Sequence, residues 1–143
     1  MSLIRLAARL MAVSSVLSLS ACFPMYVPNP SDSLVPARIF GGATPFICVD
    51  KKYHKMAKEN GPDNTEIVRL PVDKRITLQF SMRKGYPVTF SCSPAISLIP
   101  RQDTRLYIAT GFSERSCYID AVREDPRTES GVAPEPSLNY PAC

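Results

Sequence analysis

The chain is poor in the residues on which several common folds and sites depend. Its 143 residues include no tryptophan, one histidine and 6 glycines, against 14 prolines. Because proline lacks a backbone donor and fixes φ, this composition disfavours long helices and favours short strands joined by turns. A single histidine, with no two cysteines at two-residue spacing, argues against a zinc site. We expect neither a metal nor a cofactor.

The excess of positive charge is also small. The formal net charge is +4, from 17 basic and 13 acidic residues. Arg5 and Arg9 lie in a stretch that we expect to be removed, and without them 15 basic residues face 13 acidic ones. Nucleic-acid binding usually needs a clear basic excess on one face. Nucleic acid is therefore not an expected partner.

No apolar run reaches the roughly 20 residues of a membrane-spanning helix. The longest, Leu10–Leu19, is followed by Ser20-Ala21-Cys22 and stops at Phe23-Pro24. It is preceded by Met1–Arg9, which carries two arginines and no acid. A basic start, a short apolar stretch and small residues at a cleavage point are the three parts of a secretory signal. The sequence predicts that residues 1–21 are a signal peptide.

Leu19-Ser20-Ala21-Cys22 resembles the lipobox of bacterial lipoproteins, in which a leucine and two small residues precede an invariant cysteine. The resemblance implies that diacylglycerol is attached to the Cys22 thiol, that cleavage occurs before Cys22, and that the new amino group is acylated. At about 0.8 kcal/mol per buried methylene, such chains hold a protein firmly on a membrane. The alternative is ordinary secretion with cleavage after Ser20, which leaves Cys22 as a spare thiol.

The same resemblance has implications for location. In such proteins an aspartate after the cysteine retains the product in the inner membrane, and this chain has Phe23 there. We therefore expect an envelope protein on the outer membrane, facing the periplasm. Residues 22–36 contain four prolines and no apolar period, and we expect a semi-rigid tether. Residues 37–123 should form the folded domain, and the proline-rich residues 124–143 a loose tail.

Short runs of period-two alternation fill residues 37–123. The clearest is Arg75–Met82, in which apolar residues alternate with polar ones. In the next run, Tyr86, Val88, Phe90 and Cys92 should point inward. Residues 53–60 either return as a strand or form a helical turn. Turns about every 10 to 12 residues predict an all-β fold, a small antiparallel β-sandwich of about 6–8 short strands.

A second resemblance spans about residues 45–122. The chain has an Asp-Lys turn in Cys48–Lys52, a proline-led turn into a strand in Leu70–Leu78, and a polar turn before a tyrosine-containing strand in Asp103–Ile108. This order is similar to small lipoproteins with a PEGA-like or transthyretin-like β-domain, although Val72-Asp73 stands where that family usually has glycine. The resemblance implies a β-sandwich used for adhesion or assembly, with no catalytic residues.

Four cysteines remain after Cys22, namely Cys48, Cys92, Cys117 and Cys143. An even count in a small exported domain predicts two disulfides, and three connectivities are possible. We prefer Cys92–Cys117, because both residues lie in predicted core strands, and Cys48–Cys143, which would fix the tail. The alternative is free or metal-bound thiols.

Few residues indicate chemistry. His54 is the only candidate base for a nucleophile pair, and it lies in a polar stretch. Lys51, Lys52, Lys55 and Lys58 form the densest basic cluster, either a contact for anionic polymers or lipid head groups, or a solvated turn. A candidate contact loop comprises Gly111, Phe112, Ser113, Glu114 and Arg115, in which Phe112 is either exposed or plugs an open end of the sandwich.

Three functions are compatible with these features. The first is a non-enzymatic envelope lipoprotein with a structural or accessory role, bound to the membrane and to another envelope protein. The second is an inhibitor or immunity lipoprotein that inserts the loop Gly111–Arg115 into the cleft of a lytic enzyme. The third is a hydrolase, which we rank last because the sequence offers little general acid–base machinery.

Overall fold

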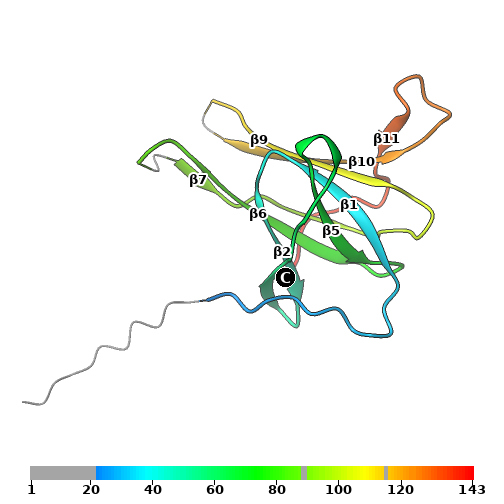
Figure 1. Cartoon of the computed structure of the whole chain (residues 1–143), viewed down its shortest axis with the longest axis horizontal. Helices are drawn as coiled ribbons and strands as arrows, with labels where there is room; N and C mark the ends of the chain where they lie inside the picture. The colour runs from blue at the N-terminus through cyan, green and yellow to red at the C-terminus, as the bar shows by residue number, and fades with distance from the viewer. Residues whose placement is uncertain (1–21, 88–89, 115) are drawn as a thin grey trace, which may run out of the picture.

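A computed structural model describes residues 22–87, 90–114 and 116–143 of the chain (Figure 1). Within these residues, eleven short strands form two sheets, and the one other element is a 3₁₀ turn at Pro62–Asn64. The predicted all-β fold is confirmed. The strands outnumber the 6–8 expected because several of them are only two to four residues long. No helix in the described residues is long and apolar enough to span a membrane.

The larger sheet has six strands, called here the six-stranded sheet. Their spatial order is β11 (Val132–Pro134), β10 (Cys117–Glu124), β9 (Leu106–Phe112), β1 (Leu34–Phe40), β5 (Glu66–Pro71) and β4 (Glu59–Asn60). β1 and β9 pair in parallel, whereas the other pairs are antiparallel. The parallel pair departs from the antiparallel expectation, because the chain visits the other sheet between β1 and β9 and returns in the same direction.

The smaller, five-stranded sheet contains β3 (Lys52–Lys55), β2 (Thr44–Val49), β6 (Ile76–Lys84) and β7 (Phe90–Cys92), with β8 (Ala95–Leu98) also paired to β6. β7 pairs with the end of β6 and β8 with its start. The strand at Lys52–Lys55 rules out the alternative of a helical turn over residues 53–60.

The two sheets bury their facing side chains against each other. The predicted inward face of β6 is confirmed, since Ile76, Leu78, Phe80 and Met82 are at most 5% exposed. Opposite them lie apolar residues of the six-stranded sheet, among them Ala37, Ile39, Val68, Leu70, Leu106, Ile108 and Ala121. Each fully buried aliphatic or aromatic side chain stabilises the fold by about 1.5–3 kcal/mol. The core is thus one contiguous layer between the sheets.

The alternation predicted after β6 fails at Tyr86. β6 continues to Lys84, and the turn that follows places the Tyr86 side chain fully in solvent. β7 resumes only at Phe90, so the inward period starts afresh there, with Phe90 and Cys92 half-buried. Val88 lies outside the described residues. The error arose because a hairpin turn interrupts the face assignment of the residues within it.

The stretch expected to be a free tether lies along the edge of the five-stranded sheet. Tyr26 donates its backbone N–H to the Lys55 carbonyl oxygen (2.8 Å), and Lys55 donates to the Pro24 carbonyl oxygen (2.8 Å). β3 is an edge strand, so its outer donors and acceptors are available to an extended segment. The tether prediction for residues 22–36 is therefore corrected, and Cys22 lies at the surface of the domain itself.

The attachment of this segment continues as far as β1. Lys74 forms an ion pair with Asp32 (2.7 Å), and Val72 donates its N–H to the Ser33 carbonyl oxygen (3.1 Å). Tyr26 packs against the core, and burial, together with the Asp32 carboxylate, raises the pKa of its phenol. β1 begins at Leu34, three residues before the expected domain boundary, because Val35 is part of the core.

Residues 132–143, called here the C-terminal strap, are also attached. The strap leaves the six-stranded sheet through β11 and reaches β8, where Ser97 and Asn139 exchange backbone hydrogen bonds of 2.9 and 3.2 Å. Thr77 then donates to the Ala142 carbonyl oxygen (2.9 Å). A disulfide joins Cys143 to Cys48, and Figure 1 marks the C-terminus beside β2. The C-terminal residues are therefore not a loose tail, and the Cys48–Cys143 pairing that was expected to fix them is present.

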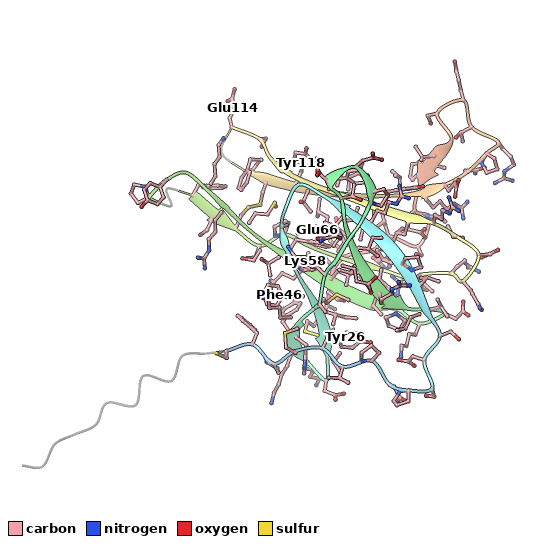
Figure 2. The ribbon with its side chains drawn as sticks, viewed as in Figure 1. Tyr26, Phe46, Lys58, Glu66, Glu114 and Tyr118 are labelled. Atoms are coloured by element: carbon pink, nitrogen blue, oxygen red, sulfur yellow. A yellow bond between two sulfur atoms is a disulfide. The ribbon has the colours of Figure 1, made fainter. Side chains whose placement is uncertain are left out.

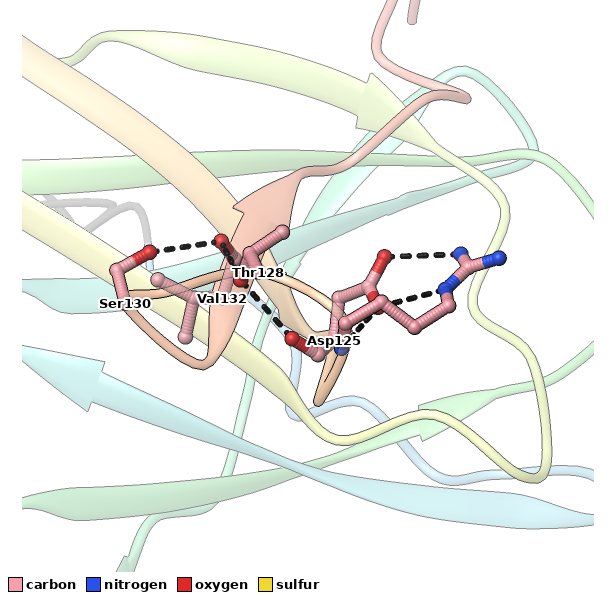
Figure 3. A network of polar contacts seen from close by, with 5 residues as sticks. Asp125, Thr128, Ser130 and Val132 are labelled. Atoms are coloured by element: carbon pink, nitrogen blue, oxygen red, sulfur yellow. Dashed lines mark hydrogen bonds and ion pairs between the residues drawn. The ribbon is translucent and has the colours of Figure 1, made fainter.

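The loop before the strap is held by a compact polar network (Figure 3). The Arg127 guanidinium donates to both oxygens of the Asp125 carboxylate (2.9 and 3.0 Å), and the Arg127 backbone N–H adds a third bond (3.1 Å). The Thr128 hydroxyl lies 2.9 Å from the Asp125 and Val132 carbonyl oxygens. This network fixes the turn that returns the chain from β10 to β11.

These contacts make one part of the stability depend on pH. Hydrogen bonds from the Arg127 side chain and backbone lower the pKa of Asp125 from 3.8 to about 2. Because the folded state binds this proton less tightly, the stabilisation is complete above pH 4 and is lost as the pH falls towards 2. We predict that Asp125→Asn lowers the urea midpoint at pH 7 and reduces its decline between pH 4 and pH 2.

The matched control is Asp103→Asn, a change of an exposed turn carboxylate. Equilibrium urea unfolding at pH 7, 4 and 2.5 should give this control the pH profile of the unmodified protein. An Asp125→Asn profile as steep as that of the unmodified protein would contradict the assignment.

Candidate functional site

An open groove of about 830 Å³ lies beside Cys22, and it is lined by residues from both the outer face and the core face of the five-stranded sheet. The register of β2, β3 and β6 places Thr44, Phe46, Lys55 and Ser81 on one face, turned away from the core. Cys22, Phe23 and Met25 form the wall nearest the start of the described chain. The remaining lining residues are Gly41, Gly42, Met82, Arg83 and Phe112. Residues distant in sequence therefore meet at Cys22.

The groove keeps its shape through one ring contact and one close backbone approach. Phe23 packs edge-on against Phe46, with 5.0 Å between ring centroids, and so covers an aromatic side chain on the outer face of β2. On the other side, Gly41 has φ +102° and lies against Thr110 of β9. A Cβ atom there would meet the Thr110 carbonyl oxygen. Glycine is required because that φ and that approach both exclude a side chain.

The chemical character of the groove is apolar with a positive rim. Phe23, Met25, Phe46, Met82 and Phe112 supply its apolar surface. Lys55 and Arg83 are the charged residues among the described residues that line it, and both are exposed. Such a surface suits a ligand that is apolar in part and negatively charged in part.

Two hairpins, β6–β7 and β9–β10, project from the body of the domain (Figure 1). A disulfide links Cys92 of β7 to Cys117 of β10, with Cα atoms 6.5 Å apart. Phe90 packs edge-on against Phe112, with 5.8 Å between ring centroids, and the Lys84 ammonium lies 5.8 Å from the centre of the Phe112 ring. The described parts of the two hairpins are thus joined to each other.

The structure divides the predicted contact loop. Gly111 and Phe112 belong to β9, and Phe112 is half-buried against the core, in keeping with the interpretation in which it closes one end of the sandwich. Ser113 and Glu114 are exposed at the hairpin tip, where Ser113 donates its N–H to the Ser116 carbonyl oxygen (2.8 Å) (Figure 2). Arg115 lies outside the described residues.

The basic cluster of residues 51–58 is also divided. Lys51 and Lys52 lie at the β2–β3 turn, whereas Lys55 faces the groove. Lys58 forms an ion pair with Glu66 of β5 (2.5 Å) (Figure 2). His54 is half-buried on β3, opposite Ile47. The described residues contain no group of three His, Cys, Asp or Glu side chains that could hold a metal ion.

The outer face of the six-stranded sheet carries aromatic side chains that the sequence analysis did not single out. Phe40 and Tyr107 lie with ring centroids 6.4 Å apart and border a second hollow of about 300 Å³. Tyr118 lies directly over Gly111, where an added Cβ atom would be 2.6 Å from the tyrosine Cζ. The signal was present in the pairing of alternate residues across β9 and β10, but it requires knowledge of the register.

Comparison with known proteins adds no relative: no protein-family model, no curated protein and no solved structure matches this chain.

The two adjacent glycines of the groove provide a matched pair for a stability measurement. Gly42 has φ +68°, and a Cβ atom there would meet open space, whereas one at Gly41 would collide with Thr110. We predict that Gly42→Ala costs about 1 kcal/mol through left-handed backbone strain, and Gly41→Ala about 3 kcal/mol or more. Urea unfolding of both variants tests this, and equal losses would show that the approach of β1 to β9 is not tight.

Proposed function

We propose that this chain is an envelope lipoprotein, anchored to a membrane by acyl chains on Cys22, with a non-enzymatic structural or accessory role. The observation that carries the proposal is the motif Leu19-Ser20-Ala21-Cys22, which follows a basic start and a short apolar run. In this proposal the outer membrane is the site of attachment, and the domain faces the periplasm.

The state of the cysteines supports the proposal. Of the five cysteines, Cys48, Cys92, Cys117 and Cys143 form two disulfides, and Cys22 is exposed and outside both. An odd cysteine in an exported protein needs a chemical role, and acylation supplies one. Two disulfides also suit an oxidising compartment such as the periplasm. By loop length, they would stabilise the domain by about 3.5 kcal/mol (Cys92–Cys117) and about 4.7 kcal/mol (Cys48–Cys143).

The structural or accessory role rests on the surfaces that the two sheets leave open. The outer face of the six-stranded sheet presents Phe40, Tyr107 and Tyr118, each at least partly exposed. Aromatic side chains on a rigid sheet are typical of protein contacts, because they bury a large area at little cost in side-chain entropy. An envelope protein is the partner that this proposal assigns to that face.

The anchor is tested by replacing the acylated atom. We predict that Cys22→Ser abolishes acylation and the cleavage that follows it, so that the mass shows residues 1–21 and no acyl chains, and the protein is no longer found with the outer membrane. Intact mass spectrometry and membrane fractionation in the native host measure both effects. The double variant Cys92→Ser, Cys117→Ser is the control, because it removes two other sulfurs and should retain both the lipid and the membrane association. An unacylated Cys22 in the unmodified protein would refute the proposal.

A second candidate function, inhibition of a lytic enzyme, is favoured by the joined hairpins. The two hairpins project from the body and are joined by the Cys92–Cys117 disulfide, and preorganised hairpins suit insertion into a cleft. Affinity capture with the full chain distinguishes the two. The accessory role predicts recovery of envelope assembly components that is lost in Tyr118→Ala. Inhibition predicts recovery of a single lytic enzyme that is lost in Glu114→Ala instead.

A further inference from the structure

The groove beside Cys22 and the β6–β7 hairpin together form a surface on which apolar and basic side chains meet. We propose that this side of the domain lies directly against an anionic lipid bilayer. The inference rests on the proposed lipid anchor at Cys22 and goes beyond it, since an anchor by itself would allow the domain to stand away from the membrane in any orientation.

The proposed anchor, Cys22, lies at the surface of the domain. Backbone hydrogen bonds between Pro24, Tyr26 and Lys55 hold the start of the described chain on β3, and Cys22 itself lines the groove. Acyl chains on Cys22 would therefore enter the bilayer at the surface of the domain. The groove would be brought into contact with the head groups, without an intervening spacer.

The segment that follows the proposed anchor has an exposed apolar surface. Phe23, Met25 and Val27 are 56%, 52% and 81% exposed, and they lie in the five residues that follow Cys22. Side chains of this kind are favourable at the boundary between head groups and acyl chains, where their apolar area leaves water. Phe23 contacts Phe46 and Met25 borders the groove, so the segment carries its exposed apolar area beside the groove.

The groove is also bordered by positive charge. Lys55 and Arg83 stand at the groove, and Lys84 follows on the same hairpin, whereas no carboxylate is found among the described residues that line the groove. Basic residues near an anionic bilayer strengthen binding by about fivefold each. The complementarity favours phospholipid head groups over an acidic or purely apolar protein surface.

Tyr86 lies at the tip of the β6–β7 hairpin, and its side chain is fully exposed. The tip lies three residues beyond Arg83 of the groove. In Figure 1 the β6–β7 hairpin and the start of the described chain project on the same side of the body. Tyrosine concentrates at membrane interfaces, where its ring contacts the apolar region and its hydroxyl stays hydrated. Tyr86 is therefore assigned to the bilayer interface, although it is distant in sequence from Cys22.

The absence of tryptophan from the chain gives a direct test. The acylated protein carrying Tyr86→Trp is reconstituted in vesicles containing brominated phospholipids, after mass spectrometry has confirmed the lipid on Cys22. The expected result is strong quenching of the single tryptophan. The matched control is Tyr118→Trp, on the outer face of the opposite sheet, which should remain unquenched. Equal fluorescence from Tyr86→Trp in brominated and plain vesicles would overturn the inference.

A second arm keeps the inference separate from the anchor. The mature chain, residues 22–143 with Cys22→Ser, is mixed with vesicles of zwitterionic lipid containing about 30% anionic phosphatidylglycerol. The additional double substitution Lys55→Gln, Arg83→Gln should weaken the binding of this chain to the vesicles by about 25-fold. The control pair Arg38→Gln, Arg105→Gln carries the same change of charge at the six-stranded sheet and should bind as the parent does.

The outcomes of the two arms are distinguishable. If the unmodified protein carries no acyl chains on Cys22 but vesicle binding still depends on Lys55 and Arg83, the anchor is refuted and the bilayer-facing surface is supported. Acylation with an unquenched tryptophan, or with equal vesicle binding by both charge pairs, would preserve the anchor and overturn the surface. Capture of a protein by the groove in place of lipid would also overturn it.

Discussion

Both ends of the described chain are held by the five-stranded sheet, and most of the surface features depend on this constraint. The N-terminal segment pairs with β3 through the backbone of Lys55, and the C-terminal strap pairs with β8 and is joined to β2 by Cys48–Cys143. Edge strands and outward side chains would otherwise be open to other chains. The N-terminal segment also forms one wall of the groove.

The strands of the core could be predicted from the sequence because alternation reports burial directly. The inward face of β6 followed from its period-two pattern. The attachments of the two ends could not be predicted, because backbone hydrogen bonds carry no side-chain signature and prolines suggested a free spacer. Tyr86 was misassigned because a pattern read through a turn has no fixed face.

The candidate site shows the same division. The sequence singled out Cys22, Lys55 and Phe112 separately, from a motif, a basic run and a loop-tip aromatic. That all three line one groove follows from long-range pairing, in particular the pairing of the N-terminal segment with β3 and the approach of β1 to β9. Periodicity specifies a face of a strand, but it does not specify which other strand reaches that face. The aromatic face around Tyr118 was missed for this reason.

The central claim is that the domain is held flush with the membrane on which Cys22 is proposed to be anchored. Neutron reflectometry of the acylated protein on a supported bilayer measures this most directly, as the thickness of the water layer between head groups and protein. The account predicts protein density that begins at the head groups. A water-filled gap of about 40 Å, the length of a 14-residue extended proline-rich spacer, would contradict it.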